Sequence, residues 1–154
     1  LDIEGGNILR EEAQGEESIR ITSSLAARMV KNKMNLWVKS NAKDEETGEK
    51  LRIHLAAGAG KTAELNRKLA CVQLGGNLTG SAEFLHKEAE KELTGHTYVV
   101  VSKNRTDEVR EALHLLSGAQ NQVLWVIPSL PGEEVPSEQN RAYTAIGWEV
   151  KPWK

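Results

Sequence analysis

Residues 97–127 read TYVVVSKNRTDEVREALHLLSGAQNQVLWVI, and this stretch decides the fold class. Two apolar runs, Tyr98–Val101 and Val123–Ile127, stand on either side of an amphipathic segment. Continuous apolar runs of this length are typical of strands that are buried on both faces, as in parallel sheets. Thr106 is positioned to cap the intervening helix, and the acidic residues after it suit the positive end of the helix dipole. The stretch therefore predicts a strand–helix–strand unit with parallel strands.

Further elements extend this unit in both directions. A helix is expected from Ser81, which is positioned to cap it, and a last strand over Ile146–Val150. Upstream, alternating apolar residues in Met34–Ser40 and Lys50–Leu55 flank a polar turn and predict a hairpin. We therefore expect an α/β, Rossmann-like fold, with a mixed, mainly parallel sheet of about five or six strands, helices on its faces and an N-terminal hairpin.

The start of the chain has a different composition. Residues 1–17 are rich in Gly, Glu and Gln, and we expect an N-terminal arm with a short helical piece near Ile8–Ala13. Residues 18–154 are predicted to form a single α/β domain. Within that domain, Ser18–Thr22 alternates as a short strand would, and a helix then runs to Val30.

Composition limits the partners and the location. With 20 basic and 22 acidic residues, the net charge of -2 gives no general attraction to nucleic acid or anionic lipid, so either would need a local patch. The single cysteine, Cys71, cannot form an internal disulfide and suits a cytoplasmic location. No apolar run is long enough to cross a membrane, and the first residues contain no signal-peptide core. Because the sequence starts at Leu1 rather than methionine, we expect a piece of a longer protein.

The best chemical lead is the loop Ala56-Ala57-Gly58-Ala59-Gly60-Lys61-Thr62, between a predicted strand and a predicted helix. In open α/β sheets, ligands bind beyond the carboxyl ends of the strands, where a glycine loop and a helix N-terminus can hold an anion. Gly58, Gly60, Lys61 and Thr62 are therefore the candidate cofactor-binding residues, for a cofactor that the sequence does not identify. The alternative is a tight structural turn that binds nothing, and the residues alone leave both interpretations open.

Two motif comparisons bear on this loop. Gly60-Lys61-Thr62 matches the end of a P-loop, although Leu55 stands where that motif needs a small residue. The stretch Ile53–Gly60, the later strands and Gly147–Val150 are similar to a class I S-adenosylmethionine-dependent methyltransferase, with His54 in place of the usual acid. Residues 50–150 thus resemble a degenerate Rossmann-type domain of that family. The resemblance implies the fold more than the activity, and a transferase of this kind would hold its cofactor at Gly58, Gly60 and Lys61.

Lysines surround a tryptophan in the predicted hairpin. Trp37 falls on the face opposite to Leu36 and Val38, so we expect its ring to be exposed. An exposed ring can stack on a base while neighbouring lysines bind phosphates. The alternative is that the ring covers a helix and the lysines solvate an edge strand. The candidate nucleic-acid-binding residues are Lys31, Lys33, Trp37, Lys39 and Lys43.

The function can be ranked but not fixed from these patterns. No arrangement of Ser, His, Cys or acidic residues predicts catalysis or metal binding, so no catalytic or metal-ligating residue is assigned and enzyme activity is left undecided. The leading hypothesis is a non-catalytic or vestigial nucleotide-fold domain. It would bind nucleic acid, single-stranded above all, or a protein partner within a larger multi-protein complex, and no membrane. The alternatives are a small nucleotide- or S-adenosylmethionine-dependent transferase and a protein-interaction module.

Overall fold

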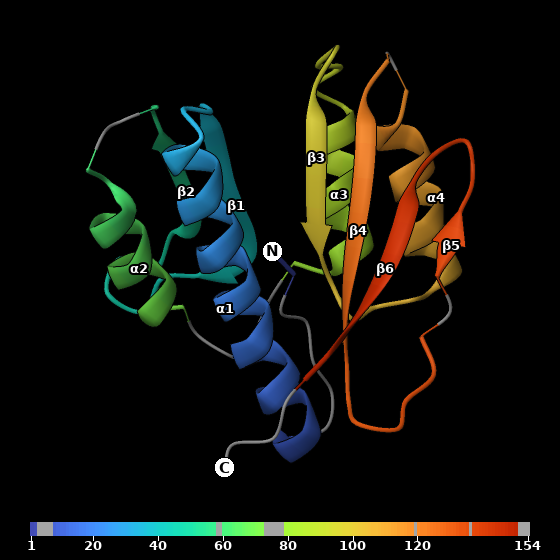
Figure 1. Ribbon diagram of the computed structural model, residues 1–154, viewed down its shortest axis with the longest axis horizontal. Helices are drawn as coiled ribbons and strands as arrows, with labels where there is room; N and C mark the ends of the chain where they lie inside the picture. Colours follow the sequence, from blue (N-terminus) through green and yellow to red (C-terminus); the bar gives the residue numbers. More distant parts are fainter. Residues whose placement is uncertain (3–7, 58–59, 73–78, 119, 136, 151–154) are drawn as a thin grey trace.

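Two separate β-sheets and four helices make up the part of the chain that the structure describes (Figure 1). The structure is a computed structural model, and it describes residues 1–2, 8–57, 60–72, 79–118, 120–135 and 137–150. The chain is therefore a mixed α/β protein, and one of its sheets is mostly parallel. The larger sheet is mixed and mainly parallel, as expected, but the hairpin does not join it and forms a sheet of its own.

The larger sheet contains the strands predicted in the second half of the chain. Its strands are β3 (Thr97–Val101), β4 (Gln122–Ser129), β5 (Glu138–Gln139) and β6 (Thr144–Glu149), in the order β3-β4-β6-β5. β3, β4 and β6 run parallel, and β5 pairs antiparallel with β6. The prediction of parallel strands over the two apolar runs is confirmed, with Val100 opposite Trp125.

Helices cover both faces of this sheet. α3 (Ser81–Ala89) and α4 (Asp107–Leu116) pack together on one face, where Leu113 and Trp125 lie in the largest core. On the other face, α1 (Ile8–Lys31) places Ile21 against Val101 and Val126. Successive residues of a strand point to opposite faces, so Trp125 and Val126 enter different cores.

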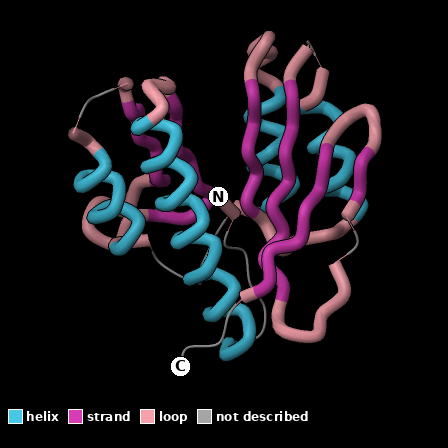
Figure 2. The backbone as a smooth tube through the Cα atoms, in the orientation of Figure 1, coloured by secondary structure: helices cyan, strands magenta, loops and turns pink. Residues whose placement is uncertain are grey.

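The smaller sheet is the predicted hairpin, and its position corrects the expected topology. β1 (Leu36–Lys43) and β2 (Lys50–Leu55) pair only with each other, antiparallel, among the described residues (Figure 2). Val38 and Ile53 belong to a separate core, which α1 and α2 (Thr62–Ala70) complete. Because these helices cover its apolar face, the hairpin satisfies its burial without joining the parallel sheet.

α1 replaces both the expected arm and the expected strand near the N-terminus. It is one continuous helix, so the boundary predicted between residues 17 and 18 falls inside it, and the strand over Ser18–Thr22 is wrong. Its buried stripe includes polar groups that bond locally: the Ser18 hydroxyl donates to the Gln14 carbonyl (2.7 Å), and Thr22 donates to the Ser18 carbonyl (2.8 Å). The Gln14 amide donates to the Pro128 carbonyl at 3.0 Å, which fixes α1 to β4.

The N-terminal cap of α4 allows a direct stability test. The Thr106 hydroxyl accepts a hydrogen bond from the Val109 amide at 3.4 Å, as the sequence predicts. We expect Thr106→Ala to lower the free energy of unfolding by about 1 kcal/mol, because one backbone donor loses its partner. Urea denaturation followed by circular dichroism measures the change. Thr106→Ser, which keeps the hydroxyl, is the control, and equal stability of the two variants would contradict the cap.

Candidate nucleic-acid interface

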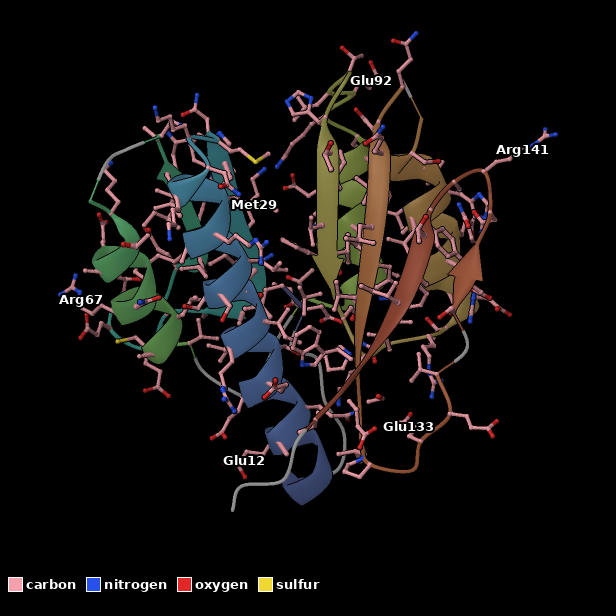
Figure 3. The ribbon with its side chains drawn as sticks, in the orientation of Figure 1. Glu12, Met29, Arg67, Glu92, Glu133 and Arg141 are labelled. Carbon is pink, nitrogen blue, oxygen red and sulfur yellow. The ribbon has the colours of Figure 1, made fainter. Side chains whose placement is uncertain are left out.

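A cleft of about 840 Å³ is lined by residues of the hairpin and of the edge strand β3 of the parallel sheet. One wall carries α1 and hairpin residues, including Met29, which is labelled in Figure 3, and Trp37. The other wall carries residues of α3, of β3 and of the segment between them, including Lys91 and Tyr98. The lining is mostly apolar, and charged or aromatic side chains stand at intervals along it. Such a cleft suits a ligand that combines flat apolar groups with charge.

Trp37 is the most exposed aromatic residue of the cleft. Trp37 is 54% exposed. Strand alternation places its side chain on the face of β1 opposite to the buried Val38. His54 lies directly across the hairpin, and the two rings stack with centroids 4.7 Å apart. The Arg52 guanidinium lies 4.8 Å from the centre of the Trp37 ring. Two strands thus supply an aromatic ring, the imidazole that stacks on it and a guanidinium that lies over it.

The structure brings together only part of the predicted lysine set. Lys39 follows Trp37 on the same face of β1 and lines the cleft. Lys43 stands six positions from Trp37, a distance of about 20 Å along a strand. Lys31 and Lys33 are exposed before β1 and do not line the cleft. Sequence reasoning did not assign Arg52 to the site. Pairing the two predicted strands in register would have placed it beside Lys39.

One carboxylate links the two walls of the cleft. Glu88 of α3 is only 9% exposed, and its Oε2 lies 2.6 Å from the Lys39 Nζ of β1. Its other oxygen pairs with Lys91. Burial alone would raise the pKa of Glu88, but the hydrogen bonds and charges of both lysines outweigh it and lower this pKa. The stabilisation from ionised Glu88 is therefore present at neutral pH and is lost as the pH falls through that lowered value.

The same arrangement lowers the pKa of Lys39. Burial lowers the pKa of its ammonium group, and the hydrogen bond and charge of Glu88 only partly offset that effect. The positive charge of Lys91 lowers the pKa further, because both lysines share one carboxylate. At this point of the cleft two lysines therefore compete for one carboxylate.

A buried polar cluster gathers around Asp2, which also lines the cleft. The Asp2 carboxylate, whose residue is 4% exposed, accepts hydrogen bonds at 2.6 Å from Asn41 of β1, Ser81 of α3 and Ser102 after β3. The Asn104 amide donates to it at 3.1 Å. The expected capping role of Ser81 is wrong, because Gly80 is the N-cap of α3 and the Ser81 hydroxyl donates to Asp2. These bonds join both sheets at one carboxylate.

The predicted glycine site lies elsewhere. Gly58 falls outside the described residues. Gly60 and Lys61 are exposed, and Thr62 begins α2. Within the described ranges β2 pairs only with β1, antiparallel, so the loop does not follow a strand of the parallel sheet. The positional reason for a cofactor at this loop is therefore wrong, and cofactor binding there stays a prediction.

Other kinds of site find little support in the described ranges. No group of three or more His, Cys, Asp or Glu side chains is placed there to hold a metal ion. None of the described helices combines the length and apolar character needed to cross a membrane. Comparison of the chain with protein-family models, with curated proteins and with solved structures finds no match.

Proposed function

We propose that this protein is a non-catalytic domain that binds single-stranded nucleic acid in the cleft between its two sheets. The observation that carries the proposal is the half-exposed Trp37 ring on the cleft wall, with the Arg52 guanidinium over it. Every base has a face that can stack on an aromatic ring, and arginine adds a cation near the sugar–phosphate backbone. Action within a larger complex remains part of the proposal.

The charges along the cleft support this ligand over a neutral one. Lys39, Arg52 and Lys91 line it, while Glu88 and Asp2 are its acidic groups. The Asp2 carboxylate accepts hydrogen bonds within the buried polar cluster. The Glu88 carboxylate forms ion pairs with Lys39 and Lys91. Arg52 therefore remains beside the ring as the cation nearest to a stacked base. A local patch of this kind can bind phosphates although the net charge of the chain is -2.

Replacing Trp37 tests the stacking directly. We expect Trp37→Ala to weaken binding of a fluorescein-labelled oligothymidylate by about fivefold or more, because stacking contributes about 1–3 kcal/mol per base. Fluorescence anisotropy at low salt measures the affinity. Trp148→Ala is the matched control, since Trp148 is also exposed (48%) but lies on β6 and donates to Glu17. Trp37→Phe should retain most of the affinity.

The salt dependence gives a second check on the same complex. Two or three phosphate contacts predict a slope of log K against log salt of about -1.4 to -2.1 for a single strand. Absence of binding by the unchanged protein at low salt, to both DNA and RNA oligonucleotides, would overturn the proposed function. Equal losses in Trp37→Ala and Trp148→Ala would place the strand outside the cleft.

A further inference from the structure

Glu88 holds together two cations from opposite walls of the cleft. Lys39 comes from β1 and Lys91 from just beyond α3, and each contacts a different oxygen of the same carboxylate. Glu88 and Lys39 are both largely withdrawn from solvent, with side chains 11% and 20% exposed. A carboxylate flanked in this way presents two anionic oxygens to two ammonium groups, as a phosphate of a bound strand would.

We propose that Lys39 and Lys91 form a phosphate subsite and that the Glu88 carboxylate occupies it when no nucleic acid is bound. A phosphate entering the cleft would replace the Glu88 carboxylate between the two ammonium groups, and Glu88 would turn towards solvent. This inference rests on the proposed function and adds to it a built-in competitor that sets the affinity of the site.

The position of the subsite relative to Trp37 supports this assignment. Lys39 lies two residues beyond Trp37 on the same face of β1, about 7 Å along the strand. A base stacked on the ring and a phosphate at Lys39 would therefore belong to the same or adjacent nucleotides. The competitor also explains why a cleft with several cations has little excess charge when empty.

Removing the charge of the competitor should tighten binding. We expect Glu88→Gln to bind the labelled oligothymidylate about three to ten times more tightly than the unchanged protein at low salt, because both lysines lose their internal partner. Glu83→Gln is the matched control, because Glu83 lies on the same helix and the change in net charge is identical. Glu83 forms an ion pair with Lys87, and both side chains are exposed. The control should change the affinity by less than about twofold.

A second pair of variants keeps the inference testable if Glu88→Gln does not fold. Lys91→Met should weaken binding several times more than Lys87→Met, since only Lys91 belongs to the subsite. In a folded Glu88→Gln protein, adding Lys39→Met should abolish the gain. Thermal melting confirms that each variant is folded before its affinity is measured.

The outcomes separate the subsite from the function on which it rests. Equal affinities of Glu88→Gln and Glu83→Gln, in a protein whose binding still depends on Trp37, would overturn the subsite and leave the proposed function standing. No binding by any variant would overturn both. A gain by Glu88→Gln for polyglutamate but not for the oligonucleotide would overturn the subsite in favour of an acidic protein partner.

Discussion

Trp125→Ala is expected to lower the free energy of unfolding by about 3–5 kcal/mol, the range found when large aromatic residues are removed from packed cores. Trp125 is fully buried between the parallel sheet and the helices α3 and α4. Its ring meets Tyr143 edge-on with centroids 5.8 Å apart, and its Nε1 donates to the Ser102 carbonyl at 3.0 Å. The substitution would leave a cavity and an unpaired carbonyl in the same place.

Two companion variants separate these contributions. Trp125→Phe keeps an aromatic ring but loses the Nε1 donor and some volume, so we expect a loss of about 1–2 kcal/mol. Trp148→Ala removes a half-exposed ring and should cost less than about 1 kcal/mol. Urea denaturation followed by tryptophan fluorescence and far-UV circular dichroism measures all three. If Trp125→Ala were no less stable than Trp148→Ala, the placement of Trp125 at the centre of the core would be wrong.

The strand–helix–strand unit around Trp125 could be predicted because its signals are local. Two uninterrupted apolar runs, a capping threonine and an amphipathic segment all lie within residues 97–127, and each has one structural interpretation at that spacing. The hairpin was predictable for the same reason, since its two alternating segments are separated by a short polar turn. The structure contains both units, although the hairpin forms a sheet of its own.

The assignment of strands to sheets could not be predicted locally. Whether β2 joins the parallel sheet depends on α1, which packs against the apolar face of the hairpin. The pattern in α1 was itself misleading, because its buried stripe includes Gln14 and Ser18. Their side chains donate hydrogen bonds to backbone carbonyls and can therefore be buried. A search for apolar residues alone thus underestimates the length of this helix.

The candidate site divides along the same line. The exposure of Trp37 could be predicted from strand alternation. Lys39 lies two residues further along the chain, so the same alternation places it on the same face as Trp37. Glu88 and Lys91 approach Lys39 only through the packing of two sheets, and no spacing in the sequence relates α3 to β1. The glycine loop shows the converse case, since a familiar motif gave a position at a sheet edge that the strand pairing does not provide.

Asp2→Ala is expected to destabilise the protein by about 3–5 kcal/mol, although it removes only one short side chain. The Asp2 carboxylate accepts bonds from the side chains of Asn41, Ser81, Ser102 and Asn104. Removing it takes a charged acceptor away from each of these four side chains, and hydrogen bonds to a charged group are worth about 1.5–3 kcal/mol each. The Asp2 amide also donates to the Val101 carbonyl at 2.8 Å, and alanine retains that bond.

The matched control is Asp44→Ala, because Asp44 is a buried carboxylate with a purely local role. It accepts backbone amides of Glu46 and Thr47 within the hairpin turn, so its loss should cost about 1–2 kcal/mol. Addition of formate should restore part of the melting temperature of Asp2→Ala, since the small anion can enter the vacated cluster, and should not help Asp44→Ala. Stability losses of equal size without formate, and equal responses to it, would show that Asp2 does not organise the donors of both sheets. A larger, formate-sensitive loss of stability at Asp2 would instead show that this carboxylate holds β1, α3 and the end of β3 together, and with them the two walls of the cleft.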